Sequence, residues 1–188
     1  MAVNSSYLTR EIARDNSWFK EIALILGASV IIALFAPVSI PLPFTPVPLA
    51  TQSHVVLLFA CLLGAKRVSF AVLAFLFQGA IGLPVFAGGA TGILHLAGPR
   101  GGYLLGYLVA AFITGLMMER MTNRTPVKVF AAMGLGNLVI YFFGIPWLSR
   151  FVGWEKAFIL GMLPFLIGDA LKLVVATRSL KSLRFFNA

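Results

Sequence analysis

An acid and a base lie three residues apart inside an apolar stretch that is long enough to cross a bilayer. Asp169 and Lys172 fall in the sequence PFLIGDALKLVVA, which covers residues 164–176. On a helix, a spacing of three residues puts both side chains on one face. Either charge costs roughly 2.5–3.5 kcal/mol near the middle of a membrane helix, so such groups usually face a bundle interior and mark a ligand or ion site. The pair predicts a polar contact for a small solute; the alternative is an internal ion pair that only joins two helices.

Other motifs for chemistry are missing. The sequence has no G-x-x-x-x-G-K-[ST] loop, so it does not predict an ATPase, and it has no G-x-S-x-G nucleophile motif. His54 and His95 are too far apart for a zinc-protease motif, and Ser53 is expected to point away from its neighbour His54 on a helix. Cys61 is the single cysteine, which excludes an internal disulfide. We expect no enzyme activity, no metal and no cofactor.

Composition identifies the class of protein that must position the acid and the base. The chain has 188 residues, of which 60% are hydrophobic and only 11% are charged, whereas a soluble domain carries about 25% charged residues. We therefore expect an all-α integral membrane protein that forms a single domain over residues 1–188. The net charge of +9 does not indicate a nucleic-acid partner, because the basic residues fall between apolar segments, as the positive-inside rule predicts for a membrane protein.

Six apolar segments are predicted, and residues 1–20 form a short amphipathic lead-in before them. The segments cover about residues 22–36, 49–64, 68–83, 103–118, 129–147 and a last one that begins near Pro164. Ala65, Lys66 and Arg67 are predicted to form a tight basic turn. A stiff proline-rich loop (residues 39–48) connects the first two segments, and a glycine-rich loop (residues 84–102) connects the third to the fourth. The apolar residues of the second loop suggest that it folds back onto the bundle.

The distribution of Lys and Arg predicts the orientation. Six segments put both termini on one side of the membrane, together with eleven basic residues: Arg10, Arg14, Lys20, Lys66, Arg67, Arg120, Arg124, Lys128, Arg178, Lys181 and Arg184. The other side has three, Arg100, Arg150 and Lys156. Both termini are therefore expected in the cytoplasm, and the two loops outside. Asp169 and Lys172 then lie about 7–8 Å and 12 Å from the outer start of the last helix, which is the layout of a site loaded from outside.

Small residues recur at a spacing of four in the first segment, Ala23 with Gly27 and Ser29 with Ala33. Such faces let another helix approach closely. The pattern is compatible with packing inside the bundle and with a partner helix.

Four motifs together resemble a known family. TPVPLATQ (residues 45–52), GAIGLPVFAGG (79–89), GPRGGYLLGY (98–107) and PFLIGDALK (164–172) are similar to BioY, the biotin-specific substrate-capture subunit of energy-coupling factor transporters. The resemblance covers nearly the whole chain after the first segment. It implies a six-helix protein of the bacterial cytoplasmic membrane that binds biotin from outside, under loops that act as a lid.

The resemblance also implies the roles of particular residues. The ligand-binding residues would be Asp169, Lys172, Tyr103, Gln52, Phe86, Gly88 and Gly89, to which we add Arg100 as a hypothesis of our own. The small residues Ala23, Gly27, Ser29 and Ala33 would face a transmembrane coupling protein, which works with two cytoplasmic ATPases. Departures from the family pattern occur at Arg100, Ala90 and the pair Leu49–Ala50; an arginine beside the lid could meet the ligand's carboxylate. The alternative function is a stand-alone channel or facilitator for a small amphipathic solute.

Overall fold

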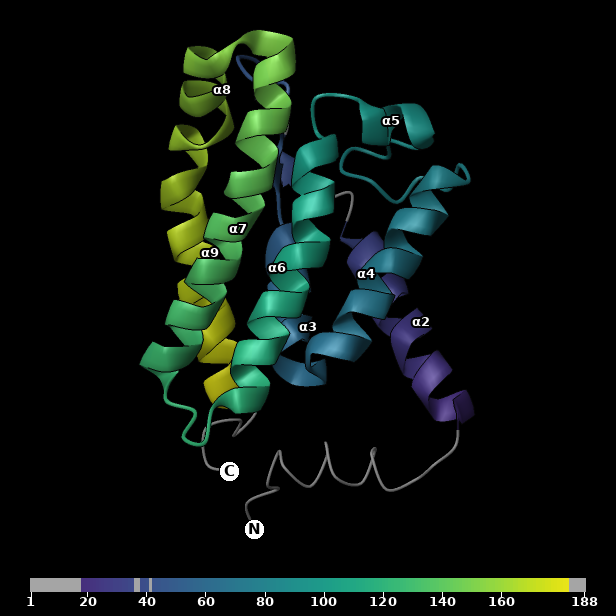
Figure 1. Cartoon of the computed structure of the whole chain (residues 1–188), viewed down its shortest axis with the longest axis vertical. Helices are drawn as coiled ribbons and strands as arrows, with labels where there is room; N and C mark the ends of the chain where they lie inside the picture. The colour runs from purple at the N-terminus through teal and green to yellow at the C-terminus, as the bar shows by residue number, and fades with distance from the viewer. Residues whose placement is uncertain (1–17, 36–37, 41, 183–188) are drawn as a thin grey trace.

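The computed structural model describes residues 18–35, 38–40 and 42–182, which form a bundle of helices (Figure 1). The helices are α2 (Trp18–Leu34), α3 (Gln52–Leu63), α4 (Ala65–Ala80), α5 (Ile93–Ala97), α6 (Gly101–Arg120), α7 (Pro126–Val152), α8 (Trp154–Gly161) and α9 (Leu163–Ser182). A two-residue antiparallel pair joins β1 (Ser39–Ile40) to β2 (Leu49–Ala50). The predicted all-α class is confirmed. Most of the predicted lead-in, and the end of the first segment at Ala36, lie outside the described residues.

Among the described residues, three helical stretches are long and apolar enough to cross a membrane. They are Gly101–Arg120, Pro126–Val152 and the combined stretch Trp154–Arg178, which joins α8 to α9. The helices α2, α3 and α4 have 17, 12 and 16 residues. At a rise of 1.5 Å per residue α3 is about 18 Å long, which is less than the roughly 30 Å of a hydrocarbon core.

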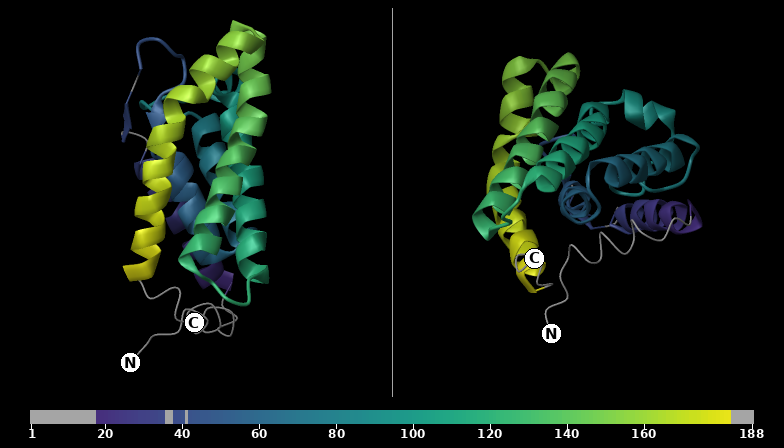
Figure 2. Two further views of the ribbon diagram at one scale, coloured as in Figure 1. Left: turned by 90° about the vertical axis from the view of Figure 1, so that its left-hand side faces the viewer. Right: turned by 60° about the horizontal axis from the view of Figure 1, so that its bottom comes forward.

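α3 lies at the centre of the bundle, and this position explains its burial. It packs against α2, α4, α6, α7 and α9, and Val56, Leu57 and Ala60 on it are fully buried. α2, in contrast, packs mainly against α3 and α4 and lies at one edge of the molecule (Figure 2). The buried face of α3 therefore connects the two halves of the bundle and carries its N-terminal turn to the middle of the fold.

The predicted basic turn at residues 65–67 is wrong, because α4 already begins at Ala65. Gly64 alone makes the turn, with φ +80°, a conformation that suits glycine. The carboxylate of Glu119 on α6 accepts a hydrogen bond of 2.7 Å from the Ala65 N–H, one of the amides that a helix start leaves without a partner. This cap comes from a residue 54 positions away, so local sequence did not reveal it.

α7 is longer than predicted and includes part of the expected outer connector. The helix starts at Pro126, where Thr125 Oγ1 accepts a hydrogen bond from Lys128 N–H (3.3 Å), and it continues past Pro146 to Val152. Proline removes one backbone donor, and membrane helices tolerate that loss where neighbouring groups compensate. Gly153, with φ +82°, ends α7 and leads directly into α8.

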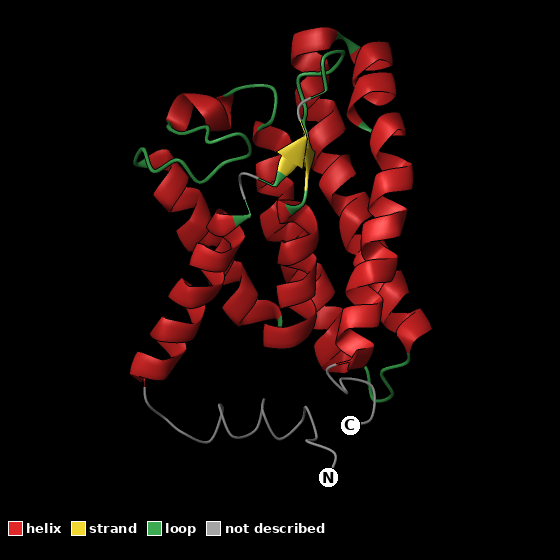
Figure 3. Ribbon diagram, turned by 180° about the vertical axis from the view of Figure 1, so that it is seen from behind, coloured by secondary structure: helices red, strands yellow, loops and turns green. Residues whose placement is uncertain are grey.

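Both long loops gather at one end of the bundle, as predicted. β1 lies in the proline-rich loop, and β2 follows it directly, where the second apolar segment was expected to begin; the helix α3 starts only at Gln52. α5 belongs to the glycine-rich loop, which folds back onto α4 and α6 (Figure 3). The start of α2 and the end of α9 lie at the opposite end (Figure 1). The loops are therefore placed to cover whatever lies between the helix ends beneath them.

Candidate functional site

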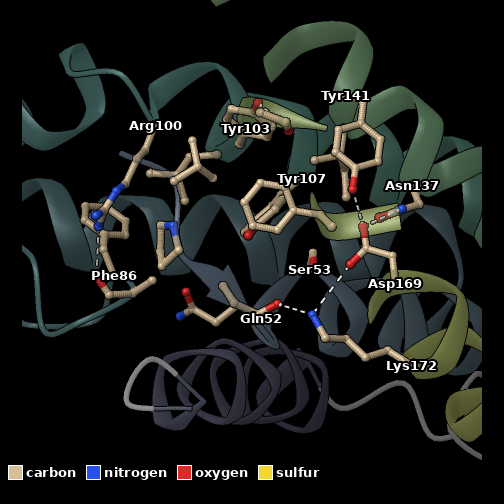
Figure 4. A pocket seen from close by; sticks show the side chains of 18 of the residues that line it. Gln52, Ser53, Phe86, Arg100, Tyr103, Tyr107, Asn137, Tyr141, Asp169 and Lys172 are labelled. Carbon is tan, nitrogen blue, oxygen red and sulfur yellow. Dashed lines mark hydrogen bonds and ion pairs between the residues drawn. The ribbon is translucent and has the colours of Figure 1, made fainter. Parts of the chain in front are cut away.

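A cavity of about 70 Å³ lies beneath the two loops, between α3, α6, α7 and α9 (Figure 4). Its wall is mostly apolar or aromatic, with a few polar groups that converge on one side. The lining residues include Ala50, Gln52, Ser53, Phe86, His95, Arg100, Tyr103, Tyr107, Asn137, Tyr141, Asp169 and Lys172. An apolar pocket with a few convergent polar groups is typical of a small-molecule site.

Asp169 on α9 is the buried acid of this cavity, with 7% of its surface exposed. Its Oδ2 accepts a hydrogen bond of 2.9 Å from Asn137 Nδ2 and a short one from the Tyr141 hydroxyl. Both donors lie on α7, four residues apart, so they share one helix face. The two hydrogen bonds fix the orientation of the carboxylate.

The other oxygen, Asp169 Oδ1, has longer contacts and faces the acid's basic neighbours. Lys172 Nζ lies 3.5 Å away and His54 Nε2 lies 3.8 Å away. The predicted pairing of Asp169 with Lys172 on one face of the last helix is therefore confirmed. Because Oδ2 is held closely and Oδ1 is not, Oδ1 is the oxygen that can accept a hydrogen bond from a ligand.

Lys172 also reaches β2, the strand that directly follows the proline-rich loop. Its Nζ donates a hydrogen bond of 3.0 Å to the carbonyl oxygen of Ala50, in β2. The lysine side chain is 21% exposed, against 10% for Asp169. Lys172 thus connects α9 to this strand, and its ammonium group lies at the cavity wall with a donor position available to an incoming oxygen.

Gln52 lines the cavity but uses its amide N–H groups on backbone carbonyls. Its Nε2 donates to the carbonyl oxygens of Ile32 (3.1 Å) and Val85 (2.8 Å), and its side chain is almost fully buried. The residue therefore ties α2 and the glycine-rich loop to the start of α3. Its side-chain carbonyl oxygen takes no part in these two hydrogen bonds.

Aromatic side chains form the apolar part of the wall. Phe86 is fully buried and stacks on His95, with ring centroids 5.3 Å apart, while Phe75 meets its edge at 5.6 Å. The ring of Phe86 fits because Gly79 has no side chain: a Cβ there would lie 2.0 Å from the ring. Tyr103 donates a hydrogen bond of 2.9 Å to the Gly161 carbonyl oxygen and presents its ring to the cavity.

Arg100 ties the two loops together above the cavity. Its Nε donates to the Pro46 carbonyl oxygen (2.6 Å) in one loop, and its Nη1 donates to the Ala87 carbonyl oxygen (3.4 Å) in the other. Burial lowers the pKa of Arg100 from its usual value, but an arginine keeps its charge at neutral pH. Figure 4 places Arg100 at the opposite end of the cavity from Asp169.

Gly88 and Gly89 lie in the turn that carries Phe86 and are not among the described residues of the cavity wall. Their φ angles are +77° and +74°, and Gly89 N–H donates to the Phe86 carbonyl oxygen at 2.9 Å. Left-handed backbone at two successive positions favours glycine. The pair thus shapes the turn that places Phe86 against the cavity.

The structure adds several residues that the sequence reasoning missed, namely Ser53, His54, His95, Tyr107, Asn137 and Tyr141. The signal for Asn137 was present: it is a polar residue in an apolar helix, as Asp169 is. The expectation that Ser53 and His54 point apart is wrong, since Ser53 Oγ lies 3.0 Å from His54 Nδ1. Rotation about the side-chain bonds brings these neighbours together.

The four small residues of α2 divide into two pairs. Ala23 and Gly27 are exposed, and a Cβ added at Gly27 would meet nothing within 4 Å. Ser29 is fully buried: its Oγ donates to the Leu26 carbonyl oxygen and accepts from Gln78 Nε2 on α4. Ala33 is partly buried against the core. Free surface for another helix is therefore present at Ala23 and Gly27.

The comparisons with known proteins agree on one family. The model of the BioY family matches residues 6–186. A biotin transporter BioY of Rhizobium etli is 41% identical over 160 residues, which cover 80% of this chain and 85% of that protein. One of Rhodobacter capsulatus is 42% identical over 165 residues, with the same coverage. The fold matches the crystal structure of the S-component for biotin from an ECF-type ABC transporter, with a TM-score of 0.81 and 29% identity, over 90% of this chain and 93% of that one.

Proposed function

This chain belongs to the BioY family, and we propose that it binds biotin outside the cell and serves as the substrate-capture subunit for its uptake. The observation that carries the proposal is the cavity under the two loops, where the buried carboxylate of Asp169 lies beside the ammonium group of Lys172. Biotin is the transported substrate in this proposal and not a cofactor, and the chain acts as a transporter component instead of an enzyme.

The chemistry of biotin complements the polar side of the cavity. Its ureido ring offers N–H donors and a carbonyl acceptor. Asp169 Oδ1 accepts from a ureido N–H, while Lys172 Nζ turns toward the ureido oxygen. Phe86 and Tyr103 cover the apolar ring system, and Gln52 Oε1 supplies a further acceptor. Gly88 and Gly89 act indirectly, through the turn that positions Phe86.

The carboxylate tail of biotin extends toward Arg100. This residue lies at the far end of the cavity from Asp169 (Figure 4), so a ligand held at its ureido end presents its acid at the loops. Two carbonyl oxygens occupy Nε and Nη1 of Arg100, and the guanidinium group has five N–H donors in all. The remaining donors are available for a carboxylate.

We further propose six membrane passages, with both termini in the cytoplasm of a bacterial cell and the loops outside. The support is the excess of Lys and Arg at one end and the position of the α2 start and the α9 end on one side of the bundle (Figure 1). Cysteine labelling in a Cys61→Ala background tests the orientation. Glu155→Cys is expected to react with an impermeant maleimide in intact cells and Asn123→Cys only after permeabilisation; the reverse pattern would overturn the orientation.

A transmembrane coupling protein and cytoplasmic ATPases supply the energy for uptake in this proposal, and α2 contacts the coupling protein. Its support is the family and the exposure of Ala23 and Gly27 at the edge of the bundle. The alternative of a conducting channel has less support, because the polar side chains of α3, α6 and α9 that line the cavity all lie in the loop-side halves of these helices.

Titration of the purified chain with biotin in detergent tests the binding function. We expect saturable binding at submicromolar ligand, and a loss of at least about a hundredfold in affinity for Asp169→Asn or Lys172→Ala, because each removes a charged partner of a buried group. Phe142→Leu, on the exposed face of α7, serves as the matched control and is expected to bind like the wild type. Absence of binding at micromolar biotin would refute the proposal.

A further inference from the structure

His54 is a buried histidine beside the acid–base pair, and the binding mode proposed above gives it no role. It lies in the first turn of α3 and is 4% exposed. Its Nδ1 contacts Ser53 Oγ at 3.0 Å, and its Nε2 lies 3.8 Å from Asp169 Oδ1. Nε2 has no hydrogen-bond partner among the described residues. A buried ring nitrogen without a partner is uncommon and calls for an explanation.

The surroundings determine which ring nitrogen carries the proton. A serine hydroxyl can donate or accept, so Ser53 allows either tautomer. If Nδ1 carried the proton, Nε2 would present a lone pair to the carboxylate of Asp169, and the two would repel. The charges of Asp169 and Lys172 balance each other, so a second proton on His54 would leave an unbalanced charge in a buried site. His54 is therefore neutral, with its Nε2–H directed at Asp169 Oδ1.

We propose that His54 is a positioning residue that donates its Nε2–H to Asp169 Oδ1 when the ligand is bound. This inference rests on the proposed biotin site. When Lys172 Nζ turns toward the ligand's oxygen, Oδ1 loses its nearest positive neighbour, which lies at 3.5 Å. A small rotation of the carboxylate, or a small movement of α9 against α3, closes the 3.8 Å gap to His54 into a hydrogen bond. The histidine then keeps Oδ1 directed at the ligand's N–H.

Three substitutions separate this role from simple packing. Glutamine can place an N–H near the position of Nε2, asparagine can place one only near Nδ1, and leucine keeps the bulk but has no N–H. We expect His54→Leu and His54→Asn to weaken biotin affinity by about tenfold, and His54→Gln to stay within about threefold of the wild type. Equal affinity in all four proteins, or an equal loss in all three variants, would overturn the inference.

Thr114→Val is the matched control, because Thr114 Oγ1 is another buried atom without a described hydrogen-bond partner, and it does not line the cavity. This variant removes an orphaned polar atom with little change of shape. Biotin affinity within about twofold of the wild type is expected. A tenfold loss would show that any buried polar group in the bundle affects binding to this degree, and would remove the case for His54.

A spectroscopic measurement tests the same inference on the unchanged protein. The chain has two histidines, so ¹⁵N-histidine labelling gives two ring systems, and His95→Gln assigns them. His54 is expected to show a protonated Nε2 and a bare Nδ1, and its Nε2–H resonance is expected to move downfield when biotin saturates the site. A protonated Nδ1 or an unchanged resonance would contradict the inference. Failure of the wild type to bind biotin is a distinct result, which would remove the proposed function and this inference with it.

Discussion

At the scale of single residues, the two oxygens of one carboxylate have different surroundings. Asp169 Oδ2 receives two close hydrogen bonds from α7, while Oδ1 faces Lys172 and His54 at 3.5 and 3.8 Å. An acid held in this way is oriented before a ligand arrives, so the ligand does not have to order it. This asymmetry is the reason for our proposal that the pair contacts a solute and does not serve only as an internal ion pair.

We expect His95 to make ligand retention sensitive to acid. Burial, and then the charge of Arg100, lower the pKa of His95 from its usual 6.5, so the closed loop holds the neutral ring that stacks on Phe86. A lowered pKa means that the closed form is fully favoured above about pH 6.5 and loses stability as the pH falls below it. We expect biotin to dissociate severalfold faster at pH 5 than at pH 7.5.

The control for this prediction is His95→Gln, which keeps a planar polar side chain but does not titrate. Its dissociation rate is expected to vary less with pH than that of the wild type, and stopped-flow displacement of labelled biotin measures both. His54 is present in both proteins, so any effect that it has on the pH dependence of the dissociation rate is the same in both. An identical pH profile in the variant would show that His95 is not the sensor.

The sequence revealed the main pair of the site but only part of its surroundings. Asp169 and Lys172 are visible because charge inside an apolar segment is costly, and their three-residue spacing fixes their common face. Asn137 carries the same kind of signal and was overlooked. His54 depends on the packing of α3 against α9, so no local pattern could pair it with a residue on the last helix.

At the scale of the elements, the arrangement depends on contacts between segments that lie far apart in the chain. The α4 start is capped by Glu119 on α6, and Arg100 joins the proline-rich loop to the glycine-rich loop. The sequence predicted the all-α class and the place of both long loops between helices, but it did not predict the strand β2 or the separate helix α8. The predicted start of α4 was wrong because this start depends on the distant carboxylate of Glu119. The predicted length of α7 was too short because the helix continues past Pro146.

Arg100 is expected to act on both the loops and the ligand. Arg100→Ala removes the hydrogen bonds to Pro46 and Ala87 and the charge that faces the biotin carboxylate, so we expect affinity for biotin to fall by about tenfold or more. Biotin amide, which has no carboxylate, separates the two effects in the same titration. The loss for the amide is expected to be smaller than the loss for biotin. Equal losses would contradict the contact with the carboxylate and would show that Arg100 affects affinity only by joining the two loops.

At the scale of the whole molecule, the capture site and the proposed partner surface lie on different parts of the bundle. The cavity is formed by α3, α6, α7 and α9, whereas Ala23 and Gly27 lie on α2 at the edge. Gln52 of the cavity wall does contact α2, but at the carbonyl oxygen of Ile32, five residues beyond Gly27. Binding and coupling should therefore be separable by mutation.

Gly27→Ile tests this separation. Nothing lies within 4 Å of a Cβ at this position, so the variant is expected to fold and to bind biotin within about twofold of the wild type. Its bulk blocks the close approach of another helix, so co-purification with the coupling protein is expected to fall by about tenfold. Ile31→Leu, exposed on the same helix, is the control. Normal assembly of Gly27→Ile would exclude this face as the contact.

A structure of the chain with biotin bound tests most directly the central claim, that biotin binds between Asp169, Lys172 and Arg100. The account predicts a ureido N–H within hydrogen-bonding distance of Asp169 Oδ1, the ureido oxygen at Lys172 Nζ, and the carboxylate at the Arg100 end beneath the loops. Biotin bound away from this cavity, or bound in it with Asp169 and Lys172 still paired only to each other, would contradict the account.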